Sequence, residues 1–285
     1  MRAPVEHALE VRGLSKTYGT GDQAVRAIDD LTFEVDPGEF LCIVGPSGCG
    51  KTTLLKCLSG LLRPSGGAAY LEGRLIEKSP DGLALVFQEY SRSLLPWMTV
   101  GANVRLPLLG QRVRRSERRS RAAEALAAVG LTGFEDKHPW QLSGGMQQRV
   151  AIARALAYQP HLLLMDEPFA SVDAQTRADL EDLVLDVHER FGITVVFVTH
   201  DIDESVYLAD RIVVLSHRPT TVKEIVSVPL ARPRDQIATK ELPAFIELRR
   251  RVIRQIKGET EEIEDTDESD DVPAGVAAAR EEVAE

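Results

Sequence analysis

Hydrophobic residues follow two patterns along the chain, and each predicts a different kind of strand. Residues 9–12 and 31–35 alternate apolar with polar side chains, which predicts antiparallel strands at one edge of the fold, with 68–71 as a candidate partner. Elsewhere, nearly continuous apolar runs are typical of strands buried on both faces. These runs are Phe40–Val44, Leu83–Phe87, Leu162–Met165, Thr194–Val198 and Arg211–Leu215.

Helical spacing dominates between residues 88 and 160, where strand signals fade. We expect Ser116 to cap a helix that carries Ala122 and Leu126 on one side and stops at Gly130. Because strand patterns stand before and after this segment, we interpret 88–160 as a helical subdomain inserted between two core strands.

A further strand at 222–228 and an amphipathic helix at 240–257 follow the core runs. Buried-strand runs that alternate with helical patterns predict an α/β fold around a mostly parallel sheet. We expect this folded unit to span residues 1–258.

Composition indicates a chain that stays in the cytoplasm. The amino terminus lacks the apolar core of an export signal, and no run approaches the roughly 18–20 apolar residues that span a bilayer. Cys42, Cys49 and Cys57 have no metal-ligand spacing, which is typical of reduced thiols.

The negative charge of the chain is concentrated at its end. The net charge is −10, yet residues 259–285 hold twelve acidic side chains against Arg280 alone, so the remaining chain is close to neutral. Low hydrophobicity with a run of like charge predicts an acidic, disordered tail at 259–285. A solvated tail that aids solubility is the simplest interpretation, and a regulatory or partner-binding role is the alternative.

A phosphate-binding loop is the first motif that carries chemistry. In this loop, Lys51 is expected to reach the β- and γ-phosphates of a nucleoside triphosphate, and the Thr52 hydroxyl to bind Mg²⁺. The glycines let backbone N–H groups curl around an anion at a helix N-terminus. The pattern G-x-x-x-x-G-K-[ST] is matched by Gly45, Pro46, Ser47, Gly48, Cys49, Gly50, Lys51 and Thr52, with Thr53 opening the helical pattern that follows. We also expect alkylation of Cys49 to block the reaction at this loop, and a bound nucleotide to protect the thiol.

Two carboxylates follow the apolar run that ends at Met165. Asp166 and Glu167 are placed at the carboxyl edge of the sheet, where α/β folds bind ligands. Asp166 suits Mg²⁺ binding, and Glu167 could orient or deprotonate the attacking water. The alternative is an acidic strand end that caps the next turn.

A second Gly-rich helix start identifies the family. Residues 142–149, which contain Ser143, Gly144 and Gly145, resemble the signature motif of ABC ATPases, with Met146 in place of the usual Gln. The resemblance implies that this motif completes the nucleotide site of the opposite subunit. It also implies a RecA-like P-loop NTPase core with an N-terminal antiparallel β subdomain.

Further positions match the family in order between about residues 9 and 230. The resemblance implies that Tyr18 stacks on adenine, that Gln88 contacts Mg²⁺ and water, and that His200 contacts the γ-phosphate. It implies MgATP as the bound nucleotide. Residues 171–173 match the D-loop, with one residue where the family commonly has two. Read alone, Tyr18, Gln88 and His200 are ordinary surface, strand-end and helix-cap residues.

The resemblance extends to the importers of nitrate, sulfonate and taurine through residues 86–90 and 94–100, where Trp97 is expected to be exposed near a docking groove instead of lying in the core. It implies a second ATPase copy, integral membrane permease subunits, a separate solute-binding protein and a place on the cytoplasmic membrane face. The alternatives are an ABC exporter, a non-transport ABC ATPase and a phosphotransferase kinase.

A cluster of six arginines lies in the predicted helical subdomain. Contact with nucleic acid or anionic lipid is one interpretation, and a solvated helix face is the other. No aromatic residues interleave, so we expect no nucleic-acid partner. The cluster comprises Arg112, Arg114, Arg115, Arg118, Arg119 and Arg121.

Overall fold

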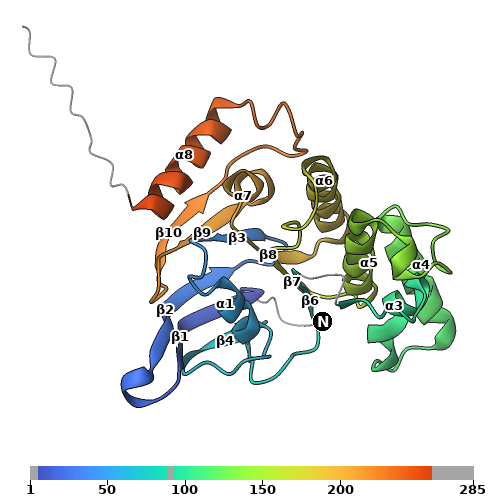
Figure 1. Cartoon of the computed structure of the whole chain (residues 1–285), viewed down its shortest axis with the longest axis horizontal. Helices are drawn as coiled ribbons and strands as arrows, with labels where there is room; N and C mark the ends of the chain where they lie inside the picture. Colours follow the sequence, from blue (N-terminus) through green and yellow to red (C-terminus); the bar gives the residue numbers. More distant parts are fainter. Residues whose placement is uncertain (1–5, 89–92, 259–285) are drawn as a thin grey trace, which may run out of the picture.

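Two sheets and the helices around them form the part of the chain that the computed structural model describes, residues 6–88 and 93–258 (Figure 1). The larger sheet has six strands in the order β10-β9-β3-β8-β7-β6. Its parallel strands are β3 (Phe40–Val44), β6 (Leu83–Val86), β7 (Leu162–Asp166), β8 (Thr194–Thr199) and β9 (Arg211–Leu215), and β10 (Val222–Ser227) pairs antiparallel with β9. The predicted α/β fold with a mostly parallel sheet is confirmed.

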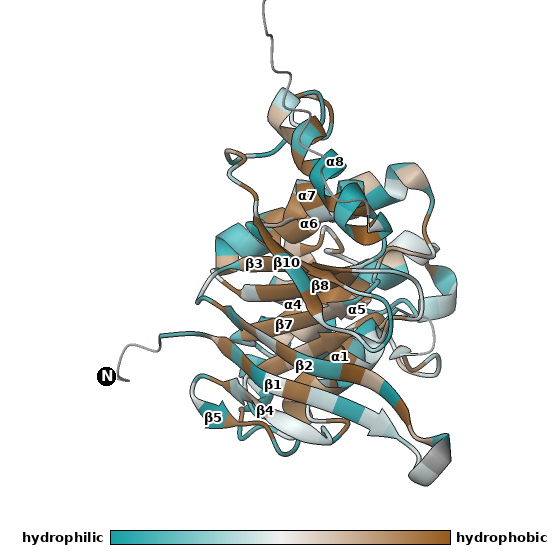
Figure 2. Cartoon of the chain, turned by 90° about the vertical axis from the view of Figure 1, so that its left-hand side faces the viewer, coloured by the Kyte–Doolittle hydropathy of each residue, from teal (hydrophilic) through white to brown (hydrophobic). Residues whose placement is uncertain are grey.

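The parallel strands are buried on both faces, as their continuous apolar runs predict. In β3, Leu41 and Ile43 point into the core between the two sheets, whereas Phe40, Cys42 and Val44 join the core beneath the helices. The central strands therefore form an apolar layer, which runs through the middle of the molecule in Figure 2. Alternate side chains of one strand thus stabilise two separate cores.

The smaller sheet is antiparallel, with the strand order β2-β1-β4-β5. It contains β1 (Leu9–Tyr18), β2 (Val25–Val35), β4 (Gly66–Leu71) and β5 (Arg74–Leu75). β1 pairs with β2 on one side and with β4 on the other, so the partner predicted at 68–71 is confirmed. The helix α1 (Lys51–Leu58) packs between this sheet and the parallel one.

The helices that the structure describes between β6 and β7 lie in the segment that joins these strands. They include α3 (Val100–Arg105), α4 (Arg115–Ala128) and α5 (Gly144–Ala157), with short 3-10 helices at Leu106–Leu109 and Pro139–Gln141. They pack on one another beside the edge strand β6, at the right of Figure 1. Ala122 and Leu126 are buried, and the helix ends before Gly130, as the pattern predicts.

The predicted cap of α4 is wrong. Arg114, in extended backbone, is the N-cap residue, and it makes no side-chain capping hydrogen bond. Ser116 already lies inside the first turn, where a side-chain hydroxyl is no longer placed to accept from the first free N–H groups. Glu117 supplies a negative charge in this turn, which favours the positive end of the helix dipole.

The last helices lie on the far face of the parallel sheet. They are α6 (Ala174–Phe191), α7 (Ile202–Leu208) and α8 (Pro243–Lys257). The helix predicted from Lys240 starts three residues later, because Pro243 occupies the first turn and fixes a helical φ there. Within the described residues, no helix is long and apolar enough to cross a bilayer. The predicted acidic tail, 259–285, lies outside them.

The aromatic packing beneath the sheet predicts a large effect on stability. Phe197 is fully buried, and its ring centroid lies 6.0 Å from that of Phe40 and 5.4 Å from that of Phe169. We expect Phe197→Ala to lower the free energy of unfolding by about 3–5 kcal/mol. The partly exposed Phe191 on α6 is the matched control, for which Phe191→Ala should cost less than about 1 kcal/mol. Equal losses in urea unfolding of the two variants would contradict this packing.

Candidate nucleotide site

The loop Gly45–Thr52 connects the end of β3 to the start of α1. Gly50 is the N-cap residue of α1, with a φ of 120° that favours glycine. The side chain of Lys51 is buried and folds back over the loop, where its Nζ donates to the carbonyl oxygens of Gly45 at 3.0 Å and Pro46 at 3.3 Å. Both of these partners are neutral, and the ammonium also forms an ion pair with Glu167 at 3.6 Å. The ammonium is thus held at the loop, where an anion can bind.

Space around the start of the loop is tight. A Cβ on Gly45 would lie 3.0 Å from Leu215 Cβ and 3.1 Å from Cys49 Sγ, so the position has little room for a side chain. Cys49 is only 2% exposed, and burial raises the pKa of its thiol. The expected sensitivity of this residue to alkylation therefore requires the loop to open first.

Asp166 and Glu167 end β7 beside the loop. Asp166 is buried, and burial raises the pKa of its carboxyl, while the Thr52 hydroxyl opposes that shift by donating to Oδ1 from 3.5 Å. A buried carboxylate next to a threonine hydroxyl is a suitable pair of oxygen donors for Mg²⁺, which favours one or two protein oxygens together with phosphates. The residues thus fit the expected metal.

Glu167 is fixed from two sides. Its Oε1 lies 3.6 Å from Lys51 Nζ, and its Oε2 lies 2.9 Å from Nδ1 of His200, which follows β8. Its backbone has a φ of 42°, which is uncommon for a residue with a side chain, and its N–H donates to the Val198 carbonyl at 2.8 Å. The carboxylate is therefore oriented between a cation and an imidazole.

Other expected residues lie at the margin of this cluster. Tyr18 is partly exposed at the end of β1, and its hydroxyl is 3.3 Å from Thr53 Oγ1, which leaves the ring near the start of α1. Gln88 is exposed just beyond β6. Ser47 and Gly48 complete the loop, and the Gly48 carbonyl accepts a hydrogen bond from a later segment.

The Gly-rich motif at 143–145 lies on another helix. Ser143 is the N-cap residue of α5 and accepts from the N–H of Met146 at 3.3 Å. A Cβ on Gly145 would lie 2.4 Å from Thr176 Cγ2, so a glycine is required for α5 to approach α6 this closely. Among the described residues, no hydrogen bond or ion pair joins this motif to Gly45–Thr52 of the same chain. Gly144 opens the helix with its N-terminus available to another molecule.

Known proteins are similar to this chain in sequence and in fold. A family model described as ABC transporter matches residues 28–170. The chain is 43% identical to the nitrate import ATP-binding protein NrtD of Synechococcus elongatus, over 83% of this chain and 86% of that protein. It is 41% identical to the bicarbonate transport ATP-binding protein CmpD of a Synechocystis species, over 85% of this chain and 86% of that one.

The chain belongs to the ABC transporter family of ATP-binding proteins. It is an ABC-type ATPase that resembles the importer ATPases of the family. A solved dimeric ATP-binding cassette with ADP and Pi bound superimposes with a TM-score of 0.68 at 34% identity, over 77% of this chain and 98% of that one. The cbiO1 subunit of Clostridium perfringens gives 0.72 at 26% identity, over 89% and 96%.

Two residues that hold the phosphate loop of this ABC ATPase were not predicted from the sequence. Thr220 donates its hydroxyl to the Cys49 carbonyl, and Arg218 Nη2 donates to the Gly48 carbonyl at 2.5 Å. Both residues follow β9, the parallel neighbour of β3, so the topology brings them to the loop. In the sequence, the one signal for this contact was the basic residue Arg218 shortly after the strand β9.

A buried polar cluster behind His200 was also missed. Asp201 caps α7 by accepting from the N–H of Glu204 at 3.1 Å, and its other oxygen pairs with Arg177 of α6 at 3.1 Å. Glu204 is buried, and burial raises its pKa to about 8, while a hydrogen bond with Thr199 opposes the shift. This cluster borders a small cavity that also contacts Glu167 and His200.

The raised pKa of Glu204 predicts a pH-dependent stability. The native state holds a proton that the unfolded chain releases above pH 4.5, so the free energy of unfolding falls as pH rises from 4.5 to about 8. Glu204→Gln removes this proton exchange. As pH rises from 4.5 to about 8, the free energy of unfolding of this variant should therefore increase by about 3–5 kcal/mol relative to that of the unsubstituted chain. The exposed Glu247 on α8 gives a control, since Glu247→Gln should leave the pH dependence unchanged. Parallel pH profiles for Glu204→Gln and the unsubstituted chain in urea unfolding would rule this out.

Proposed function

We propose that this chain is the ATP-hydrolysing subunit of an importer for a small anion, and that it works as a pair of copies at the cytoplasmic face of the membrane. The observation that carries the proposal is the position of Glu167, between Lys51 and His200 at the carboxyl end of the parallel sheet. At this position Glu167 can accept a proton from an attacking water, which suits the hydrolysis of a phosphoanhydride.

Each residue of the cluster has a role in this proposal. Lys51 exchanges its loop carbonyl partners for phosphate oxygens, and Thr52 and Asp166 hold Mg²⁺ directly or through water. Mg²⁺ neutralises phosphate charge and fixes its geometry when bound. Glu167 orients the attacking water and accepts its proton, while His200 keeps the carboxylate turned toward the reacting phosphate. Gln88 contacts the metal and Tyr18 the adenine.

Two copies are needed because the motif at Ser143–Gly145 has no role within one chain. Its helix N-terminus can accept an anion, yet it makes no hydrogen bond or ion pair to the phosphate loop within the described residues. The dimeric solved cassette that is similar to this chain supports a paired arrangement. We infer that the motif of each copy closes on the nucleotide held by the other copy.

Substitution of Glu167 tests this mechanism. Glu167→Gln keeps the shape and the hydrogen bonding but loses the proton acceptor, so we expect ATP hydrolysis to fall about 100-fold or more. Binding of MgATP should persist, and light scattering should detect a stable dimer only when MgATP is present. The unsubstituted chain and Glu247→Gln are the controls, both of which should turn over ATP. A monomeric Glu167→Gln with saturating MgATP would contradict the composite site.

The solute and the partner subunits follow from similarity and from the surface. NrtD and CmpD are named for nitrate and bicarbonate, which are small anions, as are the sulfonates expected from the sequence. Trp97 is 73% exposed after the strand β6, as expected of a residue near a docking groove and in contrast to a core tryptophan. We infer that the membrane permease subunits dock there, with a separate solute-binding protein that delivers the anion.

Docking through Trp97 is tested by co-purification. An exposed aromatic side chain buries a large apolar area when a partner covers it, so Trp97→Ala should reduce recovery of the permease subunits at least tenfold. Phe191→Ala, which removes an aromatic side chain at the last residue of α6, is the control and should recover them normally. If no multi-span membrane protein is recovered with the unsubstituted chain either, the importer assignment fails while the ATPase assignment stands.

A further inference from the structure

A second pocket lies at the edge of the parallel sheet that is opposite to the nucleotide site. Gly82 precedes β6 and His161 precedes β7, whereas Asp166 and Glu167 stand at the other end of β7. The pocket has a volume of about 610 Å³, within the range of roughly 300–1,000 Å³ that is typical of small-molecule sites. None of the nucleotide-site residues lines it.

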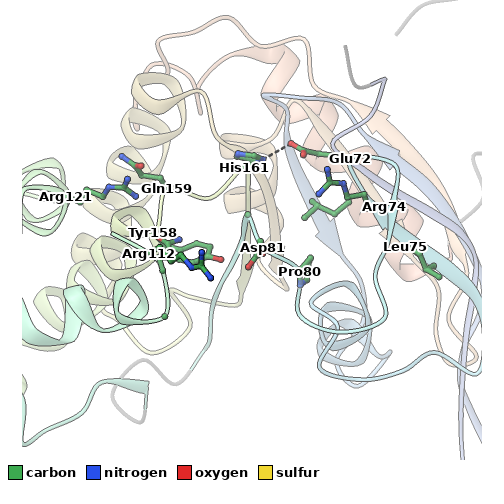
Figure 3. Close-up of a pocket in the computed structure, with 14 residues that line it drawn as sticks. Glu72, Arg74, Leu75, Pro80, Asp81, Arg112, Arg121, Tyr158, Gln159 and His161 are labelled. Atoms are coloured by element: carbon green, nitrogen blue, oxygen red, sulfur yellow. Dashed lines mark hydrogen bonds and ion pairs between the residues drawn. The ribbon is translucent and has the colours of Figure 1, made fainter. Parts of the chain in front are cut away.

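Arginines from two separate parts of the fold face each other across this pocket. Arg74 of β5 belongs to the antiparallel sheet, whereas Arg112 and Arg121 come from the helical segment that precedes and forms α4 (Figure 3). Arg121 is held by Glu117, to which its Nε donates at 3.1 Å, and it lies beside Gln159. The guanidinium groups therefore stand on both walls.

The floor between these walls is a fixed polar surface. His161 Nδ1 lies 2.7 Å from Oε1 of Glu72, which joins the turn between β4 and β5 to the start of β7. Asp81 and Gln159 add side-chain oxygens that can accept from hydroxyl groups. Guanidinium groups at both walls with acceptors between them are complementary to a ligand that is anionic at both ends and hydroxylated in the middle.

The structure distinguishes two groups within the arginine cluster found in the sequence. Arg112 and Arg121 line the pocket, whereas Arg115 and Arg119, which are as exposed as Arg112, do not. We propose that this pocket binds a small hydroxylated organic anion with two carboxylate-type ends, which bridges the antiparallel sheet and the helical segment.

Isothermal titration of the full chain with malate, citrate and lactate tests the proposal. Malate or citrate should bind once per chain, and lactate, which carries a hydroxyl but only one carboxylate, should bind at least tenfold more weakly. Arg74→Ala and Arg112→Ala should each weaken malate or citrate about tenfold through loss of one charge-assisted contact. Arg119→Ala is the matched control and should bind as the unsubstituted chain does.

A second titration at saturating MgADP tests whether malate or citrate binds in the phosphate loop instead. If these anions bind in the pocket, their affinity should be unchanged by MgADP. Loss of binding under MgADP would place the anion in the nucleotide site and overturn the proposal. Absence of binding by both polycarboxylates would overturn it as well. Equal weakening by Arg119→Ala would also do so, because it would indicate diffuse attraction to the arginine cluster.

Discussion

The parallel, in-register pairing of β3, β7, β8 and β9 is the constraint on which the site depends. Val44 is level with Thr199 on one side and Val214 on the other, and Asp166 is level with Val198. Because the strands run in one direction and end together, the segments that follow them emerge at one edge of the sheet. The phosphate loop, the carboxylates and His200 meet there although they are far apart in the chain.

At this edge of the sheet, Lys51 and Glu167 place opposite charges side by side, and the burial of either charge alone would be energetically unfavourable. Lys51 is a buried cation whose nearest partners are neutral carbonyl oxygens, and Glu167 is the carboxylate beside it. A buried charge without compensation is strongly unfavourable. Glu167 therefore compensates part of the Lys51 charge, and a bound phosphate would supply further negative charge beside the same ammonium.

The fold and the centre of the site could be predicted because their signals are local. Unbroken apolar runs define the buried strands, and each motif follows such a run or opens a helix. The residues that hydrogen-bond to the phosphate loop were harder to predict, because Thr220 and Arg218 reach the loop only through the pairing of β9 with β3. The cap predicted at Ser116 was wrong because Arg114, two residues earlier, is also polar, and the helix starts after it. The role of Gly145 in packing could not be predicted either. Its close contact with Thr176 joins α5 to α6, and the sequence does not show that these helices are neighbours.

The placement of α3, α4 and α5 between β6 and β7 has a consequence for the order in which the chain folds. These strands are hydrogen-bonded neighbours, yet residues 87–161 separate them in sequence. Closing a loop of that length costs conformational entropy, and the cost is lower once the intervening segment is compact. The local contacts of α3, α4 and α5 should therefore form early, and the β6 edge should join the sheet late. A chain still being synthesised would then expose the edge of β6 until β7, which follows the helical segment, has been made.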